Sequence, residues 1–93
     1  MIKLIGNDIW RETKKIGWVH EPYIYDHAGT KRGYVEGHYI HDMSGKKLAY
    51  LEGDYIKTED GRTTVKIEDN RAHVTGGSVS DLYRGAIRMF LGD

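Results

Sequence analysis

The sequence predicts a mainly β protein in which about four β-hairpins, repeated with a 16-residue period, surround a pseudo-symmetric axis and precede one C-terminal α-helix. The first observation is the repeat itself: residues 23–38 and 39–54 are identical at eight of sixteen positions. The second is that glycine recurs at fixed places among residues that alternate as strands do. The third is a change after residue 74, where apolar residues take helical spacing.

The repeat continues on both sides of these two units. Residues 55–70 follow without an insertion, a degenerate first unit occupies about residues 7–22, and a further half unit begins at residue 71. Such units cannot bury their apolar faces alone and need neighbours. We therefore expect a single domain over residues 1–93, with hairpin repeats over 7–74 and a helix over 78–91.

Each unit consists of two strands joined by a turn. Gly45 stands where a type I turn with a bulge needs a left-handed residue. Asp42 opens the same turn, where a carboxylate accepts hydrogen bonds from backbone N–H groups two residues on. Between units we expect two-residue loops, which fix the register of the strands, at Gly37-His38, Gly53-Asp54 and Asp69-Asn70.

This register separates the residues of the strands onto two faces. Val35 lies opposite Ile40 and Tyr34 opposite His41, and alternate residues point to opposite sides of a sheet. One face is the expected core, through the pairs Val19/Ile24, Val35/Ile40, Leu51/Ile56 and Ile67/Ala72. The other face collects aromatic residues beside polar partners, through the pairs Trp18/Tyr25, Tyr34/His41 and Tyr50/Lys57.

The last segment predicts a helix that ends at about Leu91. Ser78 to Asp81 supply a serine cap and an acidic first turn, and Gly92 can end the helix. The apolar stripe is wide, so this helix either closes one end of the β-core or packs against a copy of itself.

Residues 39–53, and their copy in residues 23–37, carry a Tyr-Ile-x-Asp-x-x-Gly motif. The strand that follows it contains a tyrosine and ends in Glu-Gly. In this motif the sequence resembles the bacterial 4-fold β-flower domain family, over about residues 7–74. The resemblance implies hairpins arranged like petals about a pseudo-four-fold axis and a bacterial source, and it brings no known activity, cofactor or catalytic residue. The chain departs from the motif at Trp10 to Thr13, which lack the turn glycine, and at Lys66, which replaces the tyrosine.

Composition disfavours several classes of function. Fourteen Lys and Arg balance fourteen Asp and Glu, whereas nucleic-acid and membrane-surface binders gain affinity from a basic excess. No apolar stretch is long enough for a signal peptide or a membrane span, so we expect a cytoplasmic protein. Basic residues do recur at the hairpin tips and would form a rim if the tips converge: Lys14-Lys15, Lys31-Arg32 and Lys46-Lys47.

Candidate chemical residues have simpler structural explanations. The chain has no cysteine and none of the common phosphate-loop, dinucleotide or hydrolase motifs. His38 and His41 have the spacing H-x-x-H, but on a strand His41 and Asp42 point to opposite faces. Asp26 and Asp42 are explained by their turns, and Glu36 and Glu52 by protection of the sheet. We predict that the protein is not an enzyme and that it has no catalytic residue, metal site or cofactor.

The predicted function is a non-enzymatic interaction or assembly module that forms a homo-oligomer. The expected contacts lie on the helix, at Leu82, Ala86, Met89 and Phe90, and on the aromatic face. The alternative is a small-ligand binding module, in which a sugar or a nucleobase stacks on the aromatic face. Its expected residues are Trp18, Tyr25, Tyr34, His41 and Tyr50.

Overall fold

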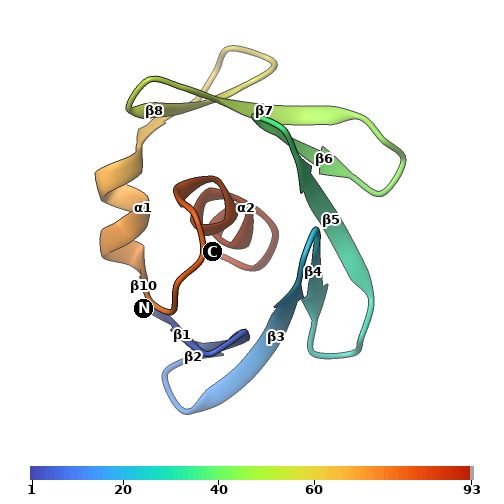
Figure 1. Ribbon diagram of the computed structural model, residues 1–93, viewed down its shortest axis with the longest axis vertical. Coiled ribbons are helices and arrows are strands. Elements are labelled where there is room, and N and C mark those ends of the chain that lie inside the picture. The colour runs from blue at the N-terminus through green and yellow to red at the C-terminus, as the bar shows by residue number, and fades with distance from the viewer. Residues whose placement is uncertain (93) are drawn as a thin grey trace.

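Ten strands form one sheet that curls around a central helix in the computed structural model, which describes residues 1–92 (Figure 1). Neighbouring strands run antiparallel in chain order from β1 to β9, and β10 pairs with β1 in parallel. The strands are β1 Ile2–Ile5, β2 Asp8–Arg11, β3 Lys14–His20, β4 Tyr23–Asp26, β5 Lys31–Glu36, β6 Tyr39–Asp42, β7 Lys47–Glu52, β8 Tyr55–Thr58, β9 Thr64–Lys66 and β10 Val74–Gly76. The helices are α1 Ile67–His73 and α2 Asp81–Leu91.

The predicted fold class, a mainly β chain of repeated hairpins with a C-terminal helix, is confirmed. β4, β6 and β8 begin at Tyr23, Tyr39 and Tyr55, which preserves the sixteen-residue period. The predicted register is also confirmed, because Val35 pairs with Ile40. The tips of successive hairpins point outward at different places around the ring rather than converging (Figure 1).

The turns use the residues that the sequence indicated. Gly45 has a φ of 90°, a left-handed conformation that a residue with a Cβ adopts only at a cost. The carboxylate of Asp42 accepts hydrogen bonds from the backbone N–H groups of Ser44 and Lys46, at 2.9 and 3.1 Å. The turn of the first hairpin lacks glycine, and there Glu12 takes a φ of 54°.

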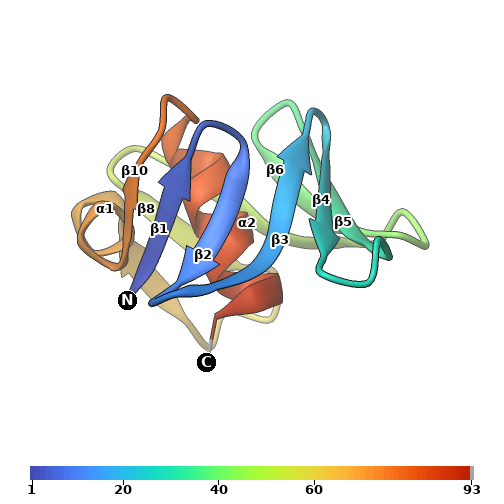
Figure 2. The same cartoon turned by 90° about the horizontal axis from the view of Figure 1, so that it is seen from below.

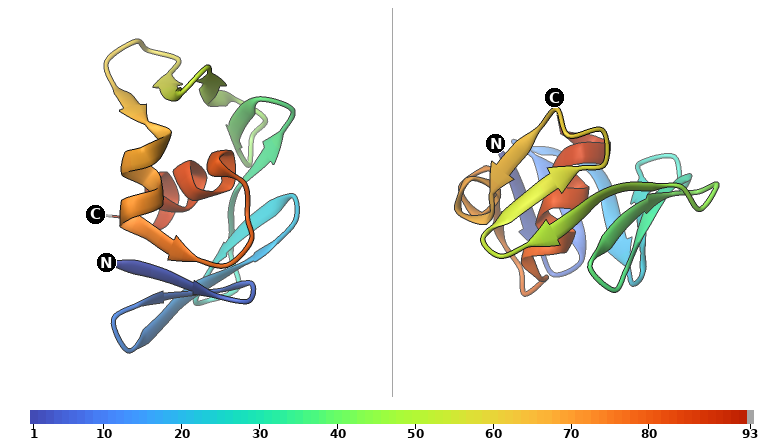
Figure 3. Two further views of the ribbon diagram at one scale, coloured as in Figure 1. Left: turned by 60° about the vertical axis from the view of Figure 1, so that its left-hand side comes forward. Right: turned by 90° about the horizontal axis from the view of Figure 1, so that it is seen from above.

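The core lies between the inner face of the sheet and α2. The views in Figures 1 to 3 show the helix enclosed by the hairpins on most sides and by α1 on another. Ile9, Ile24 and Ile40 are fully buried on the sheet, and Ala86 and Ile87 are fully buried on the helix. The helix therefore packs inside its own chain, which decides between the two positions that the sequence left open.

Small residues in the repeat make room for α2. Gly17, Gly33 and Ala49 occupy equivalent positions sixteen residues apart, and all three are buried. A Cβ at Gly33 would overlap the ring of Phe90 and lie 2.6 Å from the carbonyl oxygen of His41. The helix can approach the sheet closely because the repeat keeps this position small.

The sequence prediction is wrong for residues 67–73. We expected a two-residue loop at Asp69-Asn70 with Ile67 opposite Ala72, and the segment instead forms α1. Unlike the links at Gly37-His38 and Gly53-Asp54, it contains no glycine for a tight turn, and its charges suit a helix, with acids in the first turn and bases in the last. Asn70 faces the interior and is only 2% exposed, so the helix is also held by its buried side.

The ring closes where α1 bridges the two ends of the sheet. α1 runs from β9 to β10, and β10 pairs with β1 through Ile2 with Val74 and Leu4 with Gly76 (Figure 1). Gly76, which follows the change of pattern at residue 74, is the last residue of β10, where a Cβ would lie 2.5 Å from the carbonyl oxygen of Leu4. The two edge strands have three residues each, and such short edges discourage the addition of further strands.

α2 starts later than predicted, at Asp81 rather than Ser78. Its cap is Ser80, whose hydroxyl accepts a hydrogen bond from the backbone N–H of Tyr83 at 3.5 Å. Asp81 supplies the expected acid in the first turn, and its carboxylate binds the guanidinium of Arg71 through two hydrogen bonds of 2.7 Å. This pair joins α1 to the beginning of α2.

Candidate functional site

Aromatic side chains form a continuous row on the outer face of the sheet, across strands β3 to β7. The neighbours of these residues along each strand, such as Val19, Ile24 and Ile40, point into the core and are buried. The aromatic residues therefore point outward, and all of them are half-buried except His41, which is buried. We call the row the aromatic ladder; it consists of Trp18, Tyr23, Tyr25, Tyr34, Tyr39, His41 and Tyr50.

Cross-strand pairs hold the ladder together. The rings of Trp18 and Tyr25 stack with centroids 5.3 Å apart and planes 10° apart, and those of Tyr34 and His41 stack at 4.7 Å and 4°. Tyr23 joins the two stacks by edge contacts of 6.5 Å to Tyr25 and 6.0 Å to Tyr34. Pairs of this kind each add about 0.5–1.5 kcal/mol beyond the area they bury.

The structure brings together the five ring residues that the sequence predicted and adds two. Tyr39 lies 6.1 Å from His41 and 6.2 Å from Tyr50, and Tyr23 links the other members. The sequence carried a signal for both, because Tyr23 and Tyr39 stand two residues before Tyr25 and His41 and thus share their face. The sequence prediction did not include Tyr23 and Tyr39, because it considered only the cross-strand pairs on either side of the two-residue loops.

Three lysines near the starts of β3, β5 and β7, on the side of the hairpin tips, extend their ammonium groups over rings of the ladder. The ammonium of Lys31 lies 4.1 Å from the ring centroid of Tyr23, and that of Lys47 lies 4.1 Å from Tyr39. Lys15 lies 5.4 Å from the Trp18 ring. These are cation–π distances, each worth about 0.5–1 kcal/mol at an exposed site. Because the three lysines recur every sixteen residues, they form a basic edge: Lys15, Lys31 and Lys47.

Glutamates line the opposite edge, beside the tight loops between hairpins. Glu36 and Glu52 end β5 and β7, and both are exposed. Glu52 accepts a hydrogen bond of 3.0 Å from the ammonium of Lys57, and this bond with the carboxylate charge raises the pKa of Lys57 above its usual value. Glu36 and Glu52 form the acidic edge, and they stand at the opposite ends of β5 and β7 from Lys31 and Lys47.

The ladder uses the faces of its rings for internal contacts. Trp18 and Tyr25 cover one another, as do Tyr34 and His41, and His41 is only 8% exposed. The Nδ1 atom of His41 is buried and has no hydrogen-bond partner among residues 1–92. A planar ligand would have to displace a neighbouring ring to stack within the row.

The carboxylates and histidines that suggested chemistry are apart or engaged. Within the described part of the chain, no group of three His, Cys, Asp or Glu residues lies close enough to hold a metal ion. His38 is exposed in a loop, whereas His41 is buried in the ladder. The hydrogen bond from the Ser44 hydroxyl is the main cause of the lowered pKa of Asp42, and the turn amides add to it.

The predicted helix contacts mostly face inward. Leu82 and Ala86 are 5% and 0% exposed because they pack in the core of their own chain, so a second copy cannot contact them without opening the fold. Phe90 is half-buried against Gly33, and Met89 is 38% exposed. The ladder is therefore a better candidate interaction surface than α2.

Neither helix among residues 1–92 has the length and apolar character needed to cross a membrane. Comparisons of the chain with protein-family models, with curated proteins and with solved structures found no match. The resemblance to the 4-fold β-flower family stays a prediction.

Proposed function

We propose that this protein is a non-enzymatic assembly module that pairs with a second copy of itself through the aromatic ladder. The observation that carries the proposal is a half-buried row of seven rings with a basic edge on one side and an acidic edge on the other. Tyrosine, tryptophan and apolar contacts dominate the energetics of protein interfaces, and charged rims select the partner and its orientation.

A second copy fits this pattern better than a partner of one charge. In a two-fold dimer whose axis runs along the row of rings, the patch meets its own copy with the two edges exchanged. The basic edge of one ladder, at Lys31 and Lys47, then faces the acidic edge of the other, at Glu36 and Glu52. The formal net charge of zero means that no overall repulsion opposes this pairing.

The alternative function, a ligand stacked on Trp18, Tyr25, Tyr34, His41 or Tyr50, needs an open ring face. The two stacked pairs already cover such faces. The ring contacts therefore favour assembly over ligand stacking on this surface.

The proposal is tested by reversing one edge at a time. A Glu36→Lys/Glu52→Lys variant has two basic edges, and a Lys31→Glu/Lys47→Glu variant has two acidic edges. Each alone should associate about tenfold or more weakly than the wild type, because like charges face one another. An equimolar mixture should restore association, since every edge then meets its opposite. Sedimentation and light scattering over a concentration series measure both effects.

Glu68→Lys is the matched control, because Glu68 is exposed on α1 and lies off the ladder. It should associate like the wild type, and circular dichroism should show that every variant is folded. A wild type that stays monomeric at millimolar concentration contradicts the proposal. So does association that survives each edge reversal unchanged.

A further inference from the structure

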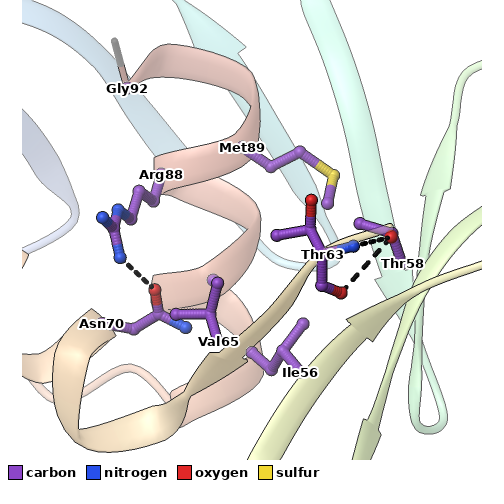
Figure 4. Close-up of a pocket in the computed structure, with 9 residues that line it drawn as sticks. Ile56, Thr58, Thr63, Val65, Asn70, Arg88, Met89 and Gly92 are labelled. Carbon is purple, nitrogen blue, oxygen red and sulfur yellow. Dashed lines mark hydrogen bonds between the residues drawn. The ribbon is translucent and has the colours of Figure 1, made fainter. Parts of the chain in front are cut away.

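A pocket with a volume of about 380 Å³ lies at the seam of the ring, on the side of the molecule formed by β8, β9, α1 and the end of α2 (Figure 4). Its volume falls within the range of about 300–1,000 Å³ that is usual for small-molecule sites. The pocket exists because α1 replaces the next hairpin of the repeat, so the sheet does not continue over α2 at this point. Gly85 of α2 contributes no side chain to it.

Apolar side chains line the middle of the pocket, Thr58 and Thr63 lie beside Met89 at one end, and a guanidinium and an amide lie at the other end. Ile56, Val65 and Met89 line the apolar part. Arg88 and Asn70 lie together at the other end, where the guanidinium Nη1 of Arg88 donates a hydrogen bond of 3.3 Å to Oδ1 of Asn70 (Figure 4). A ligand that spans the pocket would therefore meet two chemically different ends.

The donor end is incompletely satisfied. Asn70 is only 2% exposed, yet its Nδ2 donates no hydrogen bond to any of residues 1–92. Arg88 forms no ion pair with any carboxylate of the same residues. Nδ2 of Asn70 and the half-buried guanidinium of Arg88 are therefore both free to donate hydrogen bonds to an acceptor in the pocket.

We propose that this pocket binds a small monocarboxylate with an apolar body. The carboxylate accepts hydrogen bonds from the guanidinium of Arg88 and from Nδ2 of Asn70, and the body of the ligand packs against Ile56, Val65 and Met89. A planar carboxylate suits a guanidinium, which can donate two parallel hydrogen bonds to it. A single arginine balances one negative charge, which selects a monocarboxylate over a dianionic phosphate.

Phenylacetate and its neutral amide, phenylacetamide, are suitable probes because they have the same shape. Each is titrated into the isotopically labelled full chain and followed by NMR. Phenylacetate should shift the side-chain amide of Asn70 and the methyl groups of Val65 and Met89. Phenylacetamide should bind about tenfold or more weakly, because hydrogen bonds to a charged acceptor are the stronger ones.

Two variants separate the pocket from general attraction of anions. Arg88→Gln removes the charge, and Asn70→Asp gives Arg88 a carboxylate of its own, so each should weaken phenylacetate binding about tenfold or more. Arg62→Gln is the control, since Arg62 is an exposed arginine outside the lining. If Arg88→Gln does not fold, Asn70→Asp still tests the site, because its new ion pair keeps the end of the pocket occupied.

Three results would overturn the inference. These are equal affinity for the acid and the amide, unchanged binding of phenylacetate to Asn70→Asp, and shifts centred on the basic edge of the ladder instead of the pocket. Absence of any shift at high probe concentration would overturn it as well.

Discussion

The hairpins of residues 23–52 and the closing segment of residues 64–91 both enclose the core, but they do so in different ways. The hairpins follow the sequence repeat in strand length, turn and register, with a bulge at the same place in each. The closing segment starts in the repeat and leaves it, forming α1, the short β10 and α2. Local residues determine the conformation of the hairpins. The conformation of the closing segment depends instead on the core surface that the hairpins leave uncovered.

The comparison shows that a missing turn glycine does not by itself decide between hairpin and helix. The first hairpin also lacks the glycine, and Glu12 takes the left-handed conformation in its place. Residues 67–73 have a different requirement, because they bury Asn70 against Arg88 and connect the two edges of the sheet. Tertiary contacts therefore determine the helix where the local pattern is ambiguous.

The largest expected difference between the two regions is in core packing. Ile40→Ala in the hairpins removes a fully buried side chain and should lower the free energy of unfolding by about 2–5 kcal/mol. Ile67→Ala in α1 removes a half-buried side chain from a helix that favours alanine, and should cost about 1 kcal/mol. Urea denaturation measures both. Equal losses would mean that the closing segment is packed as tightly as the hairpins.

Turn substitutions sharpen the comparison at an intermediate scale. Glu12→Gly should raise the free energy of unfolding by about 1 kcal/mol, because glycine has no penalty at a φ of 54°. Gly45→Ala should lower it by about the same amount, since Gly45 has a φ of 90°.

Glu12→Ala is the control for the first of these changes. Like Glu12→Gly, it removes the 3.1 Å ion pair between Glu12 and the N-terminal amine, but it keeps the Cβ. If the two variants are equally stable, the backbone of the first turn is not strained.

The smallest expected effect concerns the contact between α1 and α2, and it depends on pH. The guanidinium of Arg71 holds the pKa of Asp81 below its ordinary value of 3.8. The ionised pair therefore stabilises the fold above that value and is lost as the pH falls through the lowered pKa. Asp81→Asn should be slightly less stable than the wild type at pH 7, and the difference should shrink below pH 3.8. Thermal melts at several pH values, with Glu59→Gln as an exposed control, measure it.

Local regularity accounts for what the sequence could predict. The Val35/Ile40 pair and the Gly45 turn follow from rules that connect neighbouring residues, and both are confirmed. The sequence also indicated a serine cap, but the helix starts three residues later than predicted and its cap is Ser80. The parallel pairing of β1 with β10 joins Ile2 to Val74, and no local pattern encodes a contact between residues so far apart in the chain.

The candidate sites divide in the same way. The ladder could be predicted in part because it follows the period of the strands, although Tyr23 and Tyr39 were missed. The pocket could not be predicted, because Asn70 and Arg88 meet only after the repeat has given way to α1 and α2. The only sequence signal is an asparagine where the repeat would place a tight loop, and it does not indicate a pocket unless the contact between α1 and α2 is known.

The pairing of β1 with β10 has a consequence for how the chain folds during synthesis. Each hairpin joins neighbouring residues and can form as soon as it leaves the ribosome. The core cannot close until Val74–Gly76 reaches β1 and α2 enters the ring. β1 is therefore made well before its partner β10, and until β10 and α2 arrive the inner face of the sheet, with Ile24 and Ile40, is open to water and to other chains.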